Sequence, residues 1–198
     1  MTFGTFEIVD LSPLLPQHLS KNQKWRTPKP IIDVARDIMG SIDLDPASSI
    51  DANEMIKAGK IFTIEDNGLA QSWKGYGNVW LNPPYGKVLV NGKKRSSKMI
   101  WLGKLIAEFG AGNIKRAMFL TTASTGEKWF DMIWQHANLV CFPRRIKFEG
   151  TSSSNPGSSV IAYFDWAIDP EYDESVDVKI VGKFSKLGTI VTSWERKT

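Results

Sequence analysis

The sequence contains very little cysteine and histidine, with one cysteine, Cys141, and two histidines, His18 and His136. A single cysteine cannot form an internal disulfide bond, and the three residues are too widely separated to match the ligand spacing of a zinc site. We therefore expect neither a disulfide framework nor a bound metal. The apolar run around Cys141 indicates a small buried side chain, which suits a reducing compartment.

The sequence also lacks an apolar stretch long enough to span a bilayer. Residues 1–20 contain no basic segment followed by an apolar run, which is the pattern of a secretory signal. With 198 residues and an ordinary apolar fraction of 42%, the chain is long enough for one domain with a sizeable core. We expect a cytoplasmic protein with an N-terminal arm at 1–24 and one folded domain at 25–198.

Acidic residues are absent from 87–98, although the formal net charge of the whole chain is only +4. Two basic segments favour contact with an anionic partner such as DNA, and we take the loops at 86–98 and 143–158 as the candidates. Such segments are also compatible with ordinary solvated loops. The basic residues are Lys87, Lys93, Lys94, Arg95 and Lys98 in the first loop, and Arg144, Arg145 and Lys147 in the second.

Apolar periodicity predicts strands that alternate with amphipathic helices, which is typical of an α/β domain with a mostly parallel sheet and helices on both faces. The first helix is expected to have Thr27 as its N-cap, Pro28 at its first position and Gly40 at its end. The expected strands are 41–45, 60–64, 77–81, 116–121, 139–142 and 158–164, the other helices are 51–60, 97–110 and 126–137, and a final hairpin is expected from 178–184 and 188–194.

Four polar loops directly follow predicted strands, and they read "IDLDPAS", "EDNG", "NPPYG" and "TTAST". In open parallel sheets, ligands bind beyond the carboxyl ends of the strands. Because these ends meet at one edge of the sheet, we expect the four loops to form the functional site together.

The loop "NPPYG" suggests a specific chemistry. An aromatic amine is a poor nucleophile because its lone pair is delocalised into the ring. The Asn82 side-chain oxygen and the Pro83 carbonyl could accept its two N–H groups, and so favour a tetrahedral nitrogen. The prolines stiffen the loop, and Tyr85 offers a face for stacking of a flipped base. The alternative is a rigid strand-to-loop turn in which Tyr85 covers the edge of the core.

The motifs "WRTP", "IDLDPAS", "DNGL", "W.G", "VWLNPPYG", "LTTAST...WF" and "CF..RIKF", in this order, resemble phage-type DNA N6-adenine methyltransferases. The resemblance runs from about Trp25 to Phe164. It implies a Rossmann-like class I methyltransferase fold and S-adenosylmethionine as cofactor, with S-adenosylhomocysteine as product. It also implies double-stranded DNA as partner, and a bacterial or phage-infected cell as the setting.

The resemblance implies a site, residue by residue. The flipped adenine would be held by Asn82, Pro83, Pro84 and Tyr85. The cofactor would contact Trp25, Thr27, Pro28, Asp43, Asp45, Pro46, Ala47, Asp66 and Asn82. The chain departs from the broader pattern after Asp45, where Ala47-Ser48-Ser49 replace a glycine-rich turn, and no residue is assigned to the cofactor ribose.

The implied reaction is methyl transfer to N6 of adenine in DNA by direct displacement, without a covalent enzyme intermediate. A four-base target such as GATC is suggested by the family alone. Two alternatives remain open, namely a methyltransferase for RNA or for protein glutamine, and a DNA-binding protein of the same fold that has lost activity.

Overall fold

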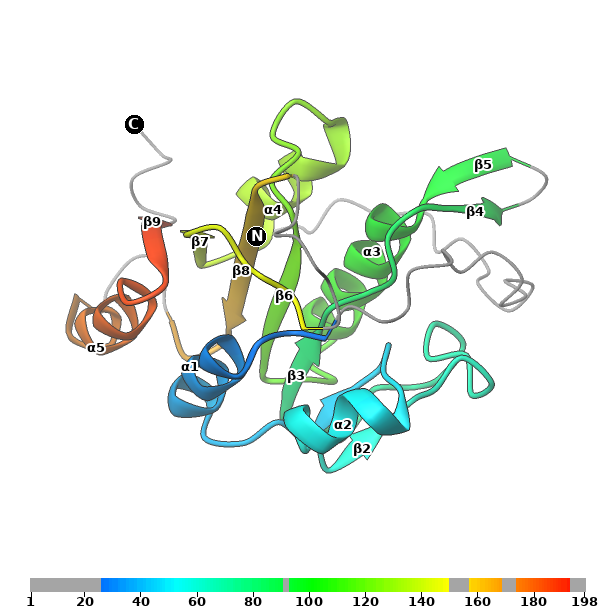
Figure 1. Cartoon of the computed structure of the whole chain (residues 1–198), viewed down its shortest axis with the longest axis horizontal. Coiled ribbons are helices and arrows are strands. Elements are labelled where there is room, and N and C mark those ends of the chain that lie inside the picture. Colours follow the sequence, from blue (N-terminus) through cyan, green and yellow to red (C-terminus); the bar gives the residue numbers. More distant parts are fainter. Residues whose placement is uncertain (1–25, 91–92, 150–156, 169–173, 193–198) are drawn as a thin grey trace.

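A seven-stranded sheet in the order β2-β1-β3-β6-β8-β7-β9 forms the centre of the fold (Figure 1). The computed structural model describes residues 26–90, 93–149, 157–168 and 174–192. The strands of this sheet are β1 Leu44–Asp45, β2 Lys60–Ile61, β3 Asn78–Leu81, β6 Arg116–Thr122, β7 Leu139–Pro143, β8 Ser159–Asp165 and β9 Gly188–Thr192.

One half of the sheet is parallel and the other half is antiparallel. Strands β2, β1, β3 and β6 run parallel, with Leu44 paired to Val79 and Val79 paired to Ala117. Strand β8 runs antiparallel to both β6 and β7, and β9 runs antiparallel to β7. The predicted α/β class is therefore confirmed, and the carboxyl ends of β1, β2, β3, β6 and β7 lie at the same edge.

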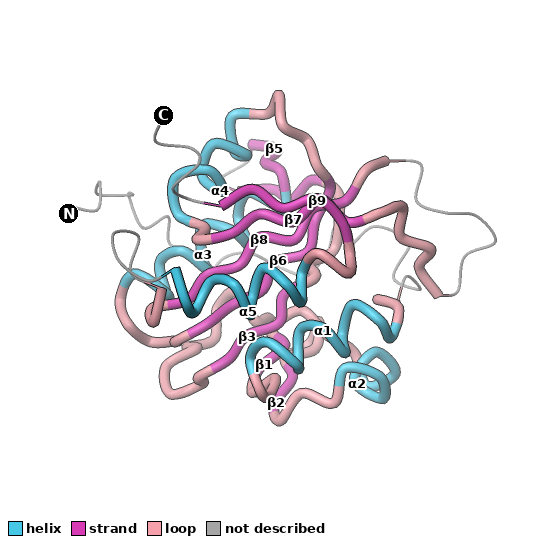
Figure 2. Tube along the Cα trace, turned by 90° about the vertical axis from the view of Figure 1, so that its left-hand side faces the viewer, coloured by secondary structure: helices cyan, strands magenta, loops and turns pink. Residues whose placement is uncertain are grey.

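Helices cover both faces of the sheet, as Figure 2 shows. One face carries α1 Lys29–Met39, α2 Ile50–Ile56 and α5 Glu174–Phe184, and the other carries α3 Ser97–Gly110 and α4 Asp131–His136 with the short 3₁₀ helix η1 Lys128–Phe130. Alternation along β3 divides its side chains between the two layers. Val79 and Leu81 pack against α3, and Trp80 packs on the side of α1, as a strand buried on both faces requires.

Helix α1 begins after Pro28, whose extended backbone makes it the N-cap, and Pro30 occupies the first turn. The predictions that Thr27 is the N-cap and Pro28 the first helical residue are wrong, because the helix begins one residue later, at Lys29. Gly40 ends the helix at φ 84°, as expected for a residue that adopts positive φ without strain. Helix α2 is capped by the Ser49 hydroxyl, which accepts the Ala52 N–H at 3.1 Å.

Two segments differ from the sequence prediction. Residues 178–184 belong to helix α5 and not to a strand, because Ile180, Val181 and Phe184 meet the core at helical spacing. The first basic segment, expected to be a loop, contains an antiparallel hairpin of β4 Lys87–Val90 and β5 Lys93–Ser96. Across the described residues, no helix has the length and apolar character needed to cross a membrane.

Gly68 lies against the strand-end loop after β1, and its backbone carbonyl accepts the buried Trp73 indole N–H at 2.9 Å. A Cβ at this position would overlap the Pro46 carbonyl oxygen. We expect Gly68→Ala to destabilise the fold by about 1–3 kcal/mol, the usual cost of overpacking. Thermal unfolding measures this, with Gly110→Ala as the control because its Cβ would meet nothing within 4 Å. Equal stability of the two variants would contradict the expectation.

Candidate functional site

The Asn82 side chain is held at both ends at the carboxyl end of β3. Its Nδ2 donates a hydrogen bond to the Thr27 hydroxyl at 3.1 Å, and its Oδ1 accepts one from the Tyr85 hydroxyl at 3.3 Å. Thr27 is buried beside the start of α1, whereas Asn82 is half-buried. The amide is therefore fixed in position while part of it stays accessible.

The two prolines and Tyr85 complete this loop. Pro83 is buried, Pro84 and Tyr85 are half-buried, and neither proline has an N–H that could compete for the Asn82 oxygen. Burial raises the pKa of the Tyr85 phenol, so the hydroxyl keeps its proton and remains a donor to Asn82. The loop thus presents a held amide beside an aromatic ring.

Asp45 is a buried carboxylic acid at the end of β1, with 2% of its surface exposed. It accepts the Ala47 N–H at 3.2 Å, and none of the ion pairs formed by the described residues includes it. Burial raises its pKa to about 7, and the Ala47 hydrogen bond opposes the rise. A cationic or hydrogen-bond-donating ligand would stabilise the ionised form.

Strand pairing brings Asp45 and Asn82 to the same edge. Leu44 pairs with Val79, so Asp45 lies opposite Trp80, and Asn82 follows two residues later on the neighbouring strand. Ser48, in the loop after β1, donates its N–H to the Phe62 carbonyl after β2 at 3.0 Å. The expectation that the strand-end loops gather at one edge is confirmed for β1, β2, β3 and β6, which run parallel as neighbours.

Two predicted cofactor residues have structural contacts of their own. Asp43 precedes β1, and its carboxylate accepts hydrogen bonds from the Ser41 hydroxyl at 2.7 Å and the Asn78 N–H at 2.9 Å. Asp66 is exposed and accepts the N–H and hydroxyl of Thr63 at 2.8 and 2.9 Å, which lowers its pKa. Asp43 therefore stabilises the amino end of β1, whereas Asp45 lies at the carboxyl end. Asp66 stabilises a turn.

The other predicted cofactor residues surround these positions. Pro28 precedes α1 directly after Thr27, and Pro46 and Ala47 follow Asp45. Trp25 lies outside the described residues. The structure thus brings together Thr27, Asn82 and Tyr85 by direct contact, and Asp45 by strand pairing.

Sequence patterns did not predict a role for Thr122 and Trp129. Both residues contact Lys98, which also contacts Tyr85. The Lys98 ammonium donates to the Thr122 hydroxyl at 2.6 Å, and it lies over the rings of both Tyr85 and Trp129. The signal available in the sequence was the polar "TTAST" loop after β6, but nothing in it indicates which lysine it meets.

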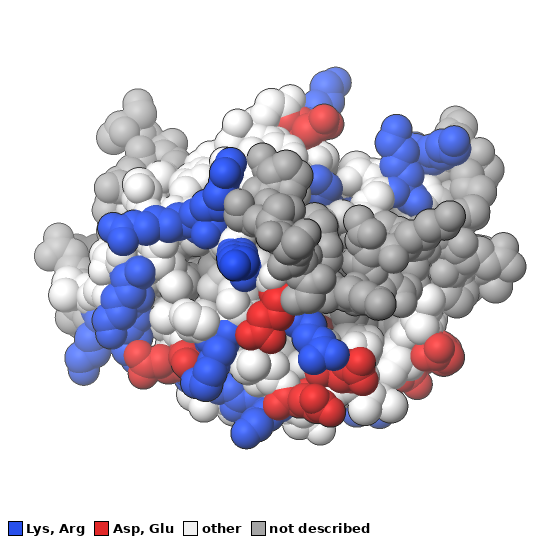
Figure 3. All heavy atoms as spheres, in the orientation of Figure 1, with Lys and Arg blue, Asp and Glu red and all other residues white. Residues whose placement is uncertain are grey.

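Basic side chains flank this edge of the sheet. Lys87, Lys94 and Arg95 are exposed on the β4–β5 hairpin, and Figure 3 shows lysine and arginine side chains gathered at the upper right, where Figure 1 places that hairpin. Arg144, Arg145 and Lys147 are exposed beyond the end of β7. Lys93 lies on β5, and its side chain is outside the described part. Both basic segments thus leave the sheet at the edge that carries Asn82.

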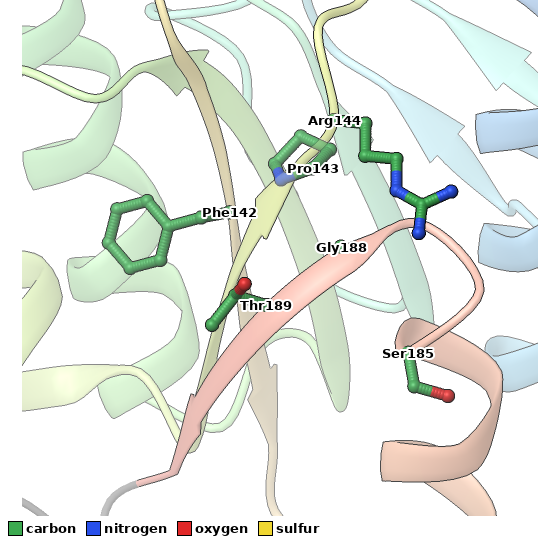
Figure 4. Close-up of a pocket in the computed structure, with 6 residues that line it drawn as sticks. All are labelled: Phe142, Pro143, Arg144, Ser185, Gly188 and Thr189. Carbon is green, nitrogen blue, oxygen red and sulfur yellow. The ribbon is translucent and has the colours of Figure 1, made fainter.

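An open pocket of about 410 Å³ lies beyond the end of β7 (Figure 4). Arg144 lines it together with the Ser185 and Thr189 side chains. Strands β8 and β7 separate it from β6 in the sheet order, so it is distinct from the Asn82 loop. Among the described residues, no group of three or more His, Cys, Asp or Glu side chains is arranged to hold a metal ion.

The comparisons with known proteins agree first on a class of fold. A crystal structure from Listeria monocytogenes, of a protein described as a class I S-adenosylmethionine-dependent methyltransferase, is similar with a TM-score of 0.50 over 84% of this chain and 73% of that one. At 12% sequence identity, this likeness shows that the two proteins share a fold.

The sequence comparison is more specific. The model of the DNA N-6-adenine-methyltransferase (Dam) family matches residues 17–173, and the chain belongs to this family. A DNA N-6-adenine-methyltransferase of Escherichia phage T1 is 35% identical over 75 residues, which is 38% of this chain and 30% of that protein. The chain thus matches less than a third of the length of this relative.

The raised pKa of Asp45 makes a prediction about stability. The unfolded-state pKa is near 3.8 and the folded value is about 7, so the folded state binds more protons between these values. Stability supplied by this group therefore falls as pH rises through that window, by up to about 1.4 kcal/mol per pH unit. Asp45→Asn removes this penalty, and we expect it to be more stable than the wild type at pH 8.

The measurement is thermal unfolding of both proteins at pH 4.5 and pH 8. The advantage of Asp45→Asn should be larger at pH 8, where the folded wild type must keep a buried charge. All other carboxylic acids are common to the two proteins, so their titration cancels in the comparison. If the stability difference between Asp45→Asn and the wild type did not grow with pH, the pKa of Asp45 would not be raised in the folded protein.

Proposed function

We propose that this protein transfers the methyl group of S-adenosylmethionine to N6 of adenine in DNA. The observation that carries the proposal is the Asn82 amide, held between Thr27 and Tyr85 at the sheet edge where the buried Asp45 carboxylate also lies. Membership of the family supports it.

The work of the protein on adenine is to bind and orient the amine. The Asn82 oxygen accepts one N–H of N6, and the Pro83 carbonyl accepts the other. Both contacts favour the tetrahedral nitrogen over the planar one and become stronger as positive charge develops during transfer. A base stacked on Tyr85 gains roughly 1–3 kcal/mol, which offsets the few kcal/mol needed to extract it from the duplex.

The residues after β1 and before α1 fit the cofactor. Bound S-adenosylmethionine would supply an activated methyl group on a positively charged sulfur, so no metal is required. Asp45 is a buried acid without a cationic partner among the described residues, and its ionised form would be stabilised by the cofactor's ammonium group. Thr27 has a hydroxyl proton to donate to the cofactor carboxylate while its oxygen accepts from Asn82.

Double-stranded DNA would lie along the edge that carries the hairpin and the β7 end. Exposed Lys94, Arg95, Arg144 and Arg145 suit phosphate contacts. A GATC-like target rests on the family alone.

Asn82→Ala tests the mechanism. We expect methyl transfer to fall by about 10²–10³-fold, the usual effect of removing one donor or acceptor aligned with the transition state. Binding of S-adenosylhomocysteine should persist because Asp45 remains. The assay combines methyl-labelled S-adenosylmethionine with unmethylated DNA, RNA or protein, followed by nucleoside and amino-acid analysis. If the labelled methyl group appeared only in RNA or in protein glutamine, DNA adenine would not be the substrate.

Asn113→Ala is the matched control. Asn113 precedes β6, at the opposite edge of the sheet, and its side-chain amide donates to the Glu108 carboxylate at 2.6 Å. Its methyl transfer should equal that of the wild type. Full activity of Asn82→Ala would refute the proposed mechanism.

The hairpin makes a separate prediction about DNA binding. Replacing Lys94 and Arg95 together by alanine should weaken binding and make the slope of log affinity against log salt shallower by about 2, since each lost phosphate contact removes about 0.9. Lys74→Ala with Lys115→Ala removes the same charge from exposed positions at the opposite edge. If both pairs change the slope equally, the hairpin has no special place in DNA binding.

A further inference from the structure

Lys98 differs from the other basic residues of its segment. Lys94 and Arg95 are exposed, whereas Lys98, the second residue of α3, is half-buried. Its ammonium donates to the Thr122 hydroxyl at 2.6 Å, and Thr122 in turn shares a hydrogen bond with the Ser124 hydroxyl at 3.0 Å. The side chain thus connects the start of α3 to the end of β6.

The same ammonium lies over two aromatic rings. Its nitrogen is 5.1 Å from the centre of the Trp129 ring and 6.0 Å from the centre of the Tyr85 ring. Trp129 is only 6% exposed, so the ammonium lies on the side of Tyr85 that faces the protein. Under the proposed function, the base would stack on the opposite face of the Tyr85 ring.

A phosphate contact would require a different environment. A lysine that neutralises phosphate extends its ammonium into solvent, as an exposed hairpin residue can. Burial instead lowers the pKa of Lys98, opposed by the nearby negative charge of Glu127. The contacts of the Lys98 ammonium with Thr122 and the two rings therefore offset the free-energy cost of its partial burial.

We propose that Lys98 is a positioning residue, which fixes the Tyr85 ring for stacking on the target base by tying it to Thr122 and Trp129. The inference rests on the proposed function, because it gives Tyr85 a base to hold. A fixed ring loses less rotational freedom when the base arrives. The hydroxyl of the same ring then stays in reach of Asn82, so Lys98 acts on both ends of the Asn82–Tyr85 pair.

The experiment compares Lys98→Met, which removes the charge and keeps an unbranched stem, with Lys98→Arg, which keeps the charge. Lys104→Met is the matched control, because Lys104 lies on the same helix over a buried tryptophan, 5.7 Å from the Trp73 ring centre. Single-turnover methyl transfer to unmethylated plasmid DNA and the salt dependence of DNA affinity are measured for each. Thermal unfolding verifies that the variants fold.

We expect Lys98→Met to lower the single-turnover rate about threefold to thirtyfold, the range for loss of a partly desolvated cation–π contact, with an unchanged salt slope. Lys98→Arg should recover most of the rate, and Lys104→Met should match the wild type. In a double-mutant cycle, Lys98→Met should add little to Tyr85→Leu, because it acts through that ring. A salt slope shallower by about 1 with an additive cycle would make Lys98 a phosphate contact and overturn the proposal.

A second measurement separates this inference from the proposed function. If the wild type transfers no methyl group, the proposed function fails, and fluorine NMR of 3-fluorotyrosine-labelled protein still tests the position of the Tyr85 ring. The Tyr85 resonance, assigned with Tyr85→Phe, should shift in Lys98→Met and stay in place in Lys104→Met. A resonance unchanged in Lys98→Met would overturn the positioning role.

Discussion

The parallel pairing of β3 between β1 and β6 is the constraint on which the rest of the molecule depends. Leu44 pairs with Val79, and Leu81 pairs with Phe119, so the loops after these strands emerge side by side. A shift of one residue would exchange the faces of Trp80 and Leu81, and the layers against α1 and α3 could no longer pack. The core thereby fixes the position of Asn82 relative to Asp45 without any direct contact between them.

Asp45 shows how stability and the proposed cofactor site oppose each other. A carboxylic acid that is buried with one backbone hydrogen bond carries a desolvation cost that its surroundings do not remove. Its neighbours Leu44 and Val79 belong to the core, so the residue cannot move into solvent without loss of packing. A buried acid with unused binding capacity at a strand end is what a ligand site requires, and under the proposed function the ligand relieves the cost.

Sequence patterns predicted the parallel half of the sheet and the loop at Asn82, because both depend on short-range signals. Short apolar runs followed by Asp45-Pro46 or Asn82-Pro83 mark strand ends locally. Residues 178–184 were predicted as a strand because they form a short apolar run with Val178, Ile180 and Val181, whereas the partner of Phe184 is Tyr163, distant in sequence. Contacts between distant residues also place Thr27 on Asn82 and Lys98 on Thr122, and no local pattern contains them.

The orientation of the Asn82 amide links the two ligands of the proposed reaction. Hydroxyl groups both donate and accept, so Thr27 and Tyr85 alone are compatible with either orientation of the amide. If a cofactor carboxylate accepts a hydrogen bond from the Thr27 hydroxyl, the Thr27 oxygen can only accept a hydrogen bond from Asn82. The amide nitrogen of Asn82 must then face Thr27. The amide oxygen then points toward Tyr85, where the amine arrives. Under the proposed function, the bound cofactor would thus leave the amide oxygen as the acceptor for the amine of the base.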